Sequence, residues 1–135
     1  MSVNVSAVQF AQPGLYAQVE AALARSGFPA SCLVLEITES SLMSDCAHAA
    51  RCLRALKALG LRIAIDDFGT GYSSLAYLRR LPIDVIKIDR ALVSDVDRDA
   101  DASAIVRAAL AMAHSLRLRV VAEGVETAAQ EMLLQ

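Results

Sequence analysis

The hydrophobic positions of the chain follow two spacings, short apolar runs typical of strands and a repeat of three to four residues typical of helices. The clearest run is 62–65, in which three of four residues are apolar and two are β-branched, so we expect a buried strand. Asp66 and Asp67 follow at its carboxyl end, and Gly69 and Gly71 allow a tight turn. Because adjacent strand residues point to opposite faces, two aspartates acting together need a bend or a common partner such as a divalent cation.

Four more apolar runs predict strands, over 1–10, 32–38, 85–88 and 120–124. Helical spacing occupies the segments between them. The predicted inward-facing positions are Leu15, Val19, Ala22 and Leu23, then Ala49, Leu53 and Leu56, then Leu75 and Leu78, then Ile105, Ala109, Met112, Ala113 and Leu116. The predicted helix starts are Ser44 or Asp45, Ser73 or Ser74, and Thr127, and the predicted ends are Gly27, Gly60 and Pro82.

Strand and helix therefore alternate, which predicts an α/β fold with right-handed parallel crossovers. Polar residues stand at or near the end of each predicted strand. The polar residues of successive strands lie 21 to 36 residues apart, which is about the length of one βα unit. A doubly wound sheet typically has one glycine-rich turn after its first strand, whereas polar ends on every strand favour a (β/α)₈ TIM-type barrel. A complete barrel needs ~250 residues. We therefore expect residues 1–135 to be an incomplete barrel of about five βα units, with strands missing at both ends.

Composition narrows the classes of function. The chain has 135 residues, 56% of them hydrophobic, so a folded core is expected. A net charge of -2 argues against binding to polymeric nucleic acid or to a membrane surface. The three cysteines lack a C-x-x-C spacing, and the chain starts without a signal peptide and contains no apolar run long enough for a membrane span. We expect a cytoplasmic chain with reduced thiols.

The strand-end residues Asn4, Glu36, Asp66, Asp67 and Glu123 offer oxygen ligands for a divalent metal site. Asp66 and Asp67 would serve two ions, with one carboxylate bridging, as in two-metal attack on a phosphodiester. Enolate chemistry also uses rim acids, a lysine and Mg²⁺, so these residues leave both reactions open.

Several of these side chains also have a simpler interpretation. Lys87, in the middle of the strand 85–88, would orient the attacking water or merely hold carboxylates apart. Asn4 suits a strand-end hydrogen bond, and Glu36 and Glu123 suit plain rim carboxylates. Glu39 would cap the next helix or bind the backbone of the 69–74 loop.

Five motifs, in order along the whole chain, carry a specific resemblance. They are Asn4-Val5-Ser6, Leu35-Glu36-Ile37-Thr38-Glu39, Asp66-Asp67-Phe68-Gly69-Thr70-Gly71-Tyr72-Ser73-Ser74-Leu75, Lys87-Ile88-Asp89-Arg90 and Ala122-Glu123-Gly124-Val125-Glu126-Thr127. Together they resemble the EAL-domain family, bacterial cyclic di-GMP phosphodiesterases built on a (β/α)₈ barrel. Residues 1–135 resemble the central part of that domain, its strands three to seven.

The resemblance implies a role for each motif. Asn4, Glu36 and Asp66 would bind one Mg²⁺ or Mn²⁺ ion, and Asp66, Asp67 and Glu123 would hold a second. Lys87 would position the attacking water and Glu39 would anchor the loop after Asp67. Asp89 and Arg90 would lie near the substrate.

There are departures from the family pattern. The glutamate of the Glu-Ala-Leu motif would precede residue 1, and the glutamine of the last-strand motif would follow residue 135. Val8 also replaces an arginine often found in the family. We therefore expect the complete domain to hydrolyse cyclic di-GMP to linear pGpG, and this segment alone to be inactive. The alternatives are a module that binds cyclic di-GMP without turnover, or a fragment with no function of its own.

Two expectations concern partners. Open barrel edges predict a homodimer or other self-association. By the resemblance, the parent protein would carry sensor or GGDEF-type domains, and such domains would anchor some parents to a membrane.

Overall fold

The protein is described here by a computed structural model that places residues 1–69 and 78–134. The short helix expected to begin at Ser73 or Ser74 and to bury Leu75 lies outside these described residues. The turn expected at Gly71 and residues 70–74 of the loop expected after Asp67 lie outside them as well.

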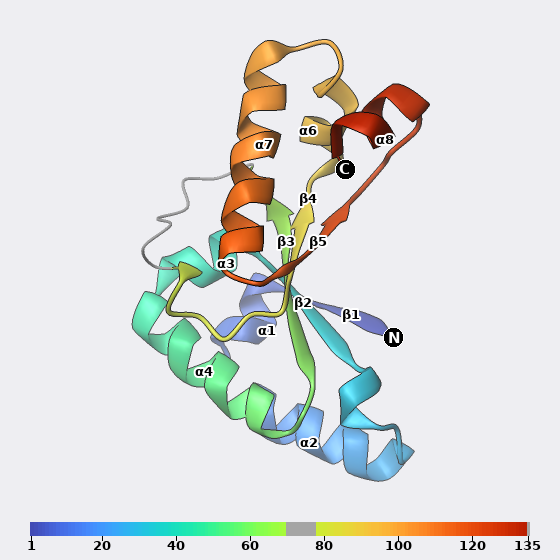
Figure 1. Ribbon diagram of the computed structural model, residues 1–135. Coiled ribbons are helices and arrows are strands. Elements are labelled where there is room, and N and C mark those ends of the chain that lie inside the picture. The colour runs from blue at the N-terminus through green and yellow to red at the C-terminus, as the bar shows by residue number, and fades with distance from the viewer. Residues whose placement is uncertain (70–77, 135) are drawn as a thin grey trace.

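A five-stranded parallel sheet forms the centre of the molecule, with the strand order β1-β2-β3-β4-β5 (Figure 1). The strands are β1 (Ser2–Val5), β2 (Val34–Thr38), β3 (Arg62–Phe68), β4 (Val85–Ile88) and β5 (Arg119–Ala122). Each strand pairs with the next one in the chain. A doubly wound sheet would reverse its strand order, so the order observed is that of a barrel segment and the predicted fold class is confirmed.

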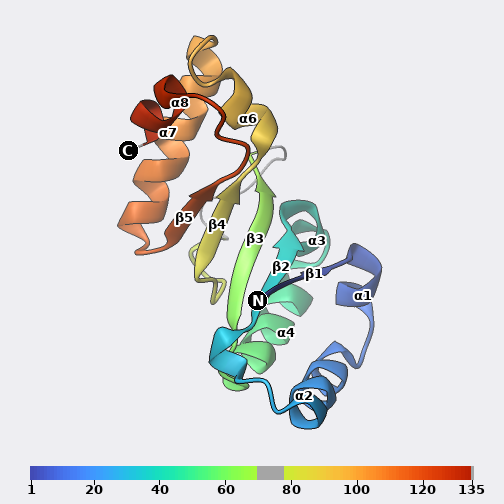
Figure 2. The same ribbon diagram turned by 90° about the vertical axis from the view of Figure 1, so that its right-hand side faces the viewer.

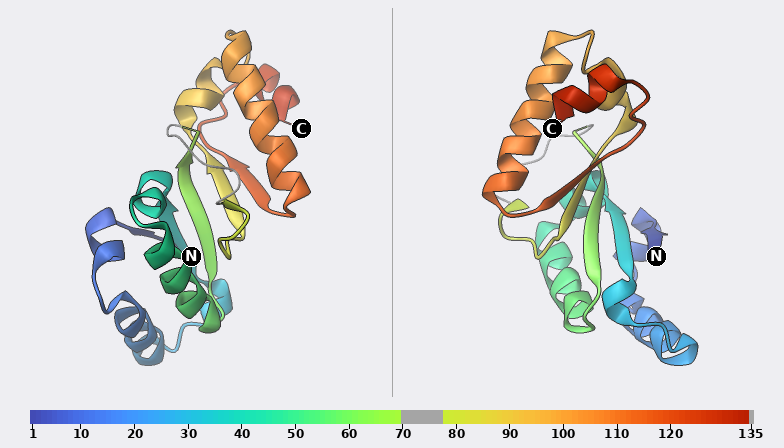
Figure 3. Two further views of the ribbon diagram at one scale, coloured as in Figure 1. Left: turned by 90° about the vertical axis from the view of Figure 1, so that its left-hand side faces the viewer. Right: turned by 45° about the vertical axis from the view of Figure 1, so that its right-hand side comes forward.

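Helices follow the strands and cover the sheet (Figure 2). They are α1 (Ala7–Ala11), α2 (Leu15–Ser26), the 3₁₀ turn η1 (Ala30–Cys32), α3 (Glu39–Ser44), α4 (Cys46–Ala58), α6 (Arg90–Asp95), α7 (Ala100–Ser115) and α8 (Ala128–Leu134). Figure 3 shows α1 to α4 gathered around the first three strands, and α6, α7 and α8 gathered around the ends of β4 and β5. No helix among the described residues is long and apolar enough to cross a membrane.

The two faces of the sheet differ in character. Ile37, Ile63, Ile65 and Ile88 are fully buried and pack in the hydrophobic core with the helices. The alternating positions face the other side, because side chains alternate along a strand. There they line a groove of about 300 Å³ that includes Glu36, Arg62, Lys87 and Arg119. Charged residues therefore lie on the side that forms the interior of a barrel.

Three of the expected strands were too long, and the one expected over 120–124 spans only Arg119–Ala122. The strand expected over 1–10 ends at Val5, because Ser6 and Gln9 form a capping box and start α1. The strand expected over 32–38 begins at Val34, since residues 30–32 form η1. The Ser-x-x-Gln signal was present in the sequence and outweighs the alternation of valines.

The long helices agree better with expectation. Gly27 ends α2 and Asp45 caps α4 through the amide of His48. In α7 the expected inward face is only partly right. Ala109 and Ala113 are buried, but Ile105 is 47% exposed and Val106 takes its place. The short helices α3 and α6, each at the carboxyl end of a strand, were not expected at all.

Candidate active site

A bulge places the two adjacent aspartates at the end of β3. The register between β3 and β4 shifts between Ile65 and Phe68, and Asp67 takes a left-handed backbone conformation with φ of 54°. Aspartate tolerates this region better than most residues. The bend that two neighbouring aspartates need, as the sequence indicated, is therefore built into the strand.

Lys87 lies at the centre of a carboxylate cluster. Its Nζ is 2.8 Å from Glu36 Oε2, 2.9 Å from Asp66 Oδ1 and 2.7 Å from Glu123 Oε1. The four side chains come from β2, β3, β4 and the residue after β5. The lysine and Glu36 side chains are each 12% exposed, whereas the side chain of Glu123 is 39% exposed. We call these four residues the rim cluster.

The rim cluster holds three carboxylates against one ammonium group. Burial by itself lowers the pKa of Lys87, but its contacts with Asp66, Glu123 and Glu36 raise that pKa well above its ordinary value. The lysine is therefore protonated at any physiological pH. Asp66 Oδ1 is buried and lies close to the ammonium, yet it has no partner in hydrogen-bonding geometry. The cluster thus keeps an excess of negative charge and an acceptor that no donor satisfies.

Asp67 lies beside the cluster. Burial raises the pKa of Asp67, and the nearby carboxylates of Asp66, Asp89 and Glu123 raise it further. Asn4 is more distant from Lys87 in the sheet: it is exposed on β1, where its partner in register is Glu36. The structure therefore brings Glu36, Asp66 and Glu123 together and leaves Asn4 on the next strand.

Glu39 is buried next to this region, although it is a charged residue. Its side chain is 2% exposed, and its Oε2 accepts a hydrogen bond of 3.0 Å from the backbone amide of Gly69. The residue begins α3 directly after β2. The backbone bond suggested by the sequence is present, and it ties α3 to the turn after Asp67.

Asp89 and Arg90 make contacts with segments next to the rim cluster. Asp89 Oδ1 caps α6 by accepting from the amide of Ala91 at 2.6 Å. The Arg90 guanidinium pairs with Glu126 at 2.6 Å. Sequence reasoning missed the role of Gln130, which is buried and accepts from the amides of Glu126 and Thr127. The Thr-x-x-Gln spacing was the signal that would have found it.

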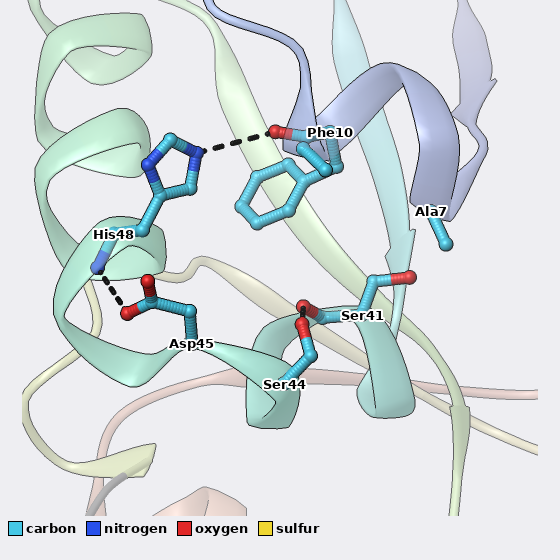
Figure 4. A pocket seen from close by; sticks show the side chains of 7 residues that line it. Ala7, Phe10, Ser41, Ser44, Asp45 and His48 are labelled. Atoms are coloured by element: carbon cyan, nitrogen blue, oxygen red, sulfur yellow. Dashed lines mark hydrogen bonds between the residues drawn. The ribbon is translucent and has the colours of Figure 1, made fainter.

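A second hollow, of about 190 Å³, lies between α1, α3 and α4 (Figure 4). The ring of His48 packs edge-on against Phe10, and its Nε2 lies 3.4 Å from the Phe10 carbonyl oxygen. Ser44 donates to the Ser41 carbonyl. The contacts of His48 join α4 to α1, whereas the Ser44 bond lies within α3.

The rim cluster suits a divalent cation in its chemistry. Carboxylate oxygens are the ligands that Mg²⁺ and Mn²⁺ prefer, and the unsatisfied Asp66 oxygen offers one lone pair. Among the described residues, no three His, Cys, Asp or Glu side chains are arranged around a common metal position. The Lys87 ammonium instead stands where three carboxylates converge.

A parallel sheet in sequential strand order, with acids and a lysine at its carboxyl edge, places the chain in the class of TIM-barrel proteins, whose active sites lie at that edge. Comparison with known families identifies the group within that class. The family model for the EAL domain matches residues 1–135, and the chain belongs to this family.

Curated relatives agree with the family assignment. The chain is 49% identical over 134 residues to the bifunctional diguanylate cyclase/cyclic di-GMP phosphodiesterase MucR of Pseudomonas aeruginosa, covering 99% of this chain and 20% of MucR. It is 44% identical over 135 residues to the cyclic di-GMP phosphodiesterase NbdA of the same organism, covering 100% of this chain and 17% of NbdA. The chain therefore spans about a fifth of the length of these relatives.

Solved structures agree as well. The phosphodiesterase of MucR in complex with c-di-GMP superposes with a TM-score of 0.95 at 50% identity, over 98% of this chain and 54% of that one. Klebsiella pneumoniae BlrP1, in a complex with manganese and cyclic di-GMP, gives a TM-score of 0.87 at 32% identity, over 99% of this chain and 34% of that one. The five-stranded sheet is thus the same as part of these larger domains.

Proposed function

We propose that the protein of which this chain is part hydrolyses cyclic di-GMP to linear pGpG with two divalent cations, Mg²⁺ or Mn²⁺. The observation that carries the proposal is the convergence of Glu36, Asp66 and Glu123 at the carboxyl edge of an EAL-family sheet. Relatives named as cyclic di-GMP phosphodiesterases support the substrate.

The oxygen ligands would divide between the two ions in this proposal. Asn4, Glu36 and Asp66 would hold one ion, and Asp66, Asp67 and Glu123 would hold the other, so Asp66 would serve both. When bound, such a pair of ions activates a water molecule and stabilises the leaving oxygen. In the overall reaction water adds to one phosphorus atom, the bond from that phosphorus to a ribose 3′-oxygen breaks, and the freed oxygen takes up a proton.

Lys87 acts as a fixed cation in the proposed reaction. The carboxylates around it raise the pKa of Lys87, so it serves in this proposal as a cation and not as a proton acceptor. The ammonium instead orients the attacking water by donating to it, and offsets negative charge on the phosphoryl oxygens. Glu39 holds the turn at Gly69 and so keeps Asp67 in place. Asp89 adds negative charge beside Asp67.

The proposal extends to cellular context. A cytoplasmic location fits the three free cysteines. The strands β1 and β5 form the two edges of the described sheet and suit pairing with another copy or with further strands. MucR is named as a diguanylate cyclase as well as a phosphodiesterase, which supports a GGDEF-type domain in the parent protein.

The test is a turnover assay on the full-length protein. Purified protein stripped of metal is incubated with cyclic di-GMP and either Mg²⁺ or Mn²⁺, and the products are separated by chromatography. We expect pGpG only when metal is present. If calorimetry detects binding of cyclic di-GMP but no pGpG forms with either Mg²⁺ or Mn²⁺, the protein is instead a binding module. The Lys87 ammonium, which lies where the carboxylates converge, also suits that alternative.

A further inference from the structure

Helix α6 contacts both turns that carry the rim carboxylates. The backbone turn after Asp67 passes under Leu92: a β-carbon at Gly69 would collide with the Leu92 Cδ1 atom. The turn after Glu123 passes under Arg90 in the same way. A β-carbon at Gly124 would meet Arg90 Cγ and would lie 2.9 Å from Arg90 Cδ. One helix thus packs on two glycines, one lying two residues after Asp67 and the other directly after Glu123.

The turn after Glu123 is held to α6 at two points. Arg90 Nη2 donates to Glu126 Oε1 at 2.6 Å. One helical turn later, Ser94 offers its carbonyl oxygen to Gln130 Nε2 at 3.5 Å. Gln130 in turn accepts from the amides of Glu126 and Thr127 at 2.8 and 3.1 Å. Residues four apart lie on the same helix face, so Arg90 and Ser94 contact the turn after Glu123 from one face of α6.

Glu123 needs such support more than the other rim residues. It lies beyond the end of β5, and its amide donates to the Ile88 carbonyl at 3.1 Å as the last bond of the β4–β5 ladder. Its side chain is the most exposed in the rim cluster, and Gly124 follows at a φ of 70°. The ladder therefore holds Glu123 through its amide, and the Arg90 side chain covers the residue that follows it.

We infer that Arg90 is a positioning residue for Glu123, acting through Glu126 and Gly124 rather than by touching substrate. The aliphatic part of Arg90 covers Gly124, and its guanidinium is engaged by Glu126. This inference rests on the proposed function and differs from the expectation that Arg90 lies near the substrate.

The test compares three variants of the full-length protein, Arg90→Gln, Glu126→Gln and the double variant. If Arg90 acts through Glu126, each single variant lowers kcat and Mn²⁺ affinity by ~10-fold, the usual range for residues that orient a ligand. The KM for cyclic di-GMP stays within about twofold because no substrate contact is lost. The losses of kcat and Mn²⁺ affinity in the double variant are no larger than those in the more impaired of the two single variants.

Two further measurements separate positioning from general damage. Hydrogen exchange of the metal-free protein reports on residues 119–127 directly, and we expect faster exchange there in Arg90→Gln and Glu126→Gln. Arg90→Lys keeps the stem and the charge and should restore most of kcat. The matched control is Arg98→Gln, since Arg98 is 76% exposed and lies 3.9 Å from its neighbour Asp97.

Each outcome decides the inference. A raised KM with unchanged kcat, Mn²⁺ affinity and exchange would assign Arg90 to the substrate and overturn it. Losses in the double variant that multiply those of the single variants would do the same. If Arg90→Gln does not fold, Glu126→Gln carries the test, because its side chain is 64% exposed. A wild-type protein without turnover would refute the proposed function, while Mn²⁺ affinity and exchange still test the role of Arg90.

Discussion

Two lysine–carboxylate assemblies stand at opposite edges of the sheet. At the amino edge, Lys57 Nζ donates to both oxygens of Asp84 at 2.6 and 2.8 Å, and the amide of Ile63 donates to the same carboxylate at 2.8 Å. At the carboxyl edge, Lys87 faces three carboxylates, and one oxygen of Asp66 lacks a hydrogen bond. The first assembly is balanced in charge, and both of its carboxylate oxygens have donors. The second assembly has neither property.

This difference separates a structural pair from the proposed metal site. The pair of Lys57 and Asp84 joins α4 to the segment before β4 and to the start of β3. An excess of buried negative charge costs stability unless a cation relieves it. In barrel folds conserved chemistry lies at the carboxyl edge and stability at the amino edge, and the two lysines follow that division.

The largest expected effect comes from removing the shared ligand. Asp66→Asn in the full-length protein should lower kcat by ~10³-fold, because it weakens electrostatic stabilisation at both proposed ions. Asn4→Ala should do less, since it is exposed and serves one ion. Steady-state kinetics at a fixed Mg²⁺ concentration measure both. Near-normal turnover by Asp66→Asn would show that the two-metal assignment is wrong.

The next effect in size concerns Glu39. Glu39→Ala removes the carboxylate that holds the Gly69 amide, so the turn after Asp67 loses its anchor. We expect Mn²⁺ affinity and kcat to fall together by ~10–100-fold with the fold intact. Circular dichroism reports whether the variant is folded, and calorimetry on the same preparation measures its Mn²⁺ affinity. A variant that unfolds outright would mark Glu39 as purely structural.

The amino-edge pair should show the opposite profile. Lys57→Met keeps the aliphatic stem but leaves Asp84 with one donor fewer, so unfolding free energy should drop by about 1–2 kcal/mol. The kcat and KM of the folded protein should not change. Denaturant unfolding and kinetics on the same sample test this. A loss of kcat as large as that of the Glu39 variant would erase the distinction between the two edges.

The smallest expected effect is a pH-dependent one at Asp67. Its pKa is raised in the folded protein above the ordinary value of 3.8, so ionisation opposes folding. The favourable contribution of the neutral Asp67 side chain to stability is complete below its unfolded pKa and is lost as the pH rises through its folded pKa. Asp67→Asn should therefore raise the Tm of the metal-free protein at pH 7, and the gain should shrink toward pH 4. A Tm difference independent of pH would contradict the raised pKa.

The sequence predicted the parallel sheet well because buried strands and amphipathic helices have simple periods. Ile63 and Ile65 marked β3, and Asp45 marked the start of α4. The bend at Asp67 also followed, from the need for two adjacent carboxylates to act at one edge. The converging acids Glu36, Asp66 and Glu123 were predictable because parallel strands share one carboxyl edge.

The remaining features depend on contacts between distant segments. The helices α3 and α6 each have six residues, too few for a periodic signal to show. The position of Lys87 within three ion pairs depends on register across β2 to β5. Arg90 over Gly124 joins residues more than thirty positions apart, and neither residue by itself indicates the other. Local pattern therefore predicts the elements, whereas packing decides which polar residues meet.

The central claim is that the unbalanced charge of the rim cluster is a site for divalent cations. Calorimetric titration of Mn²⁺ into the metal-free full-length protein tests it most directly, with Asp66→Asn as the disrupted variant and Lys57→Met as the matched control. The account predicts that wild type and Lys57→Met bind Mn²⁺ equally and that Asp66→Asn binds at least ~10-fold more weakly. Equal Mn²⁺ affinity in all three proteins, or no binding to wild type, would contradict it.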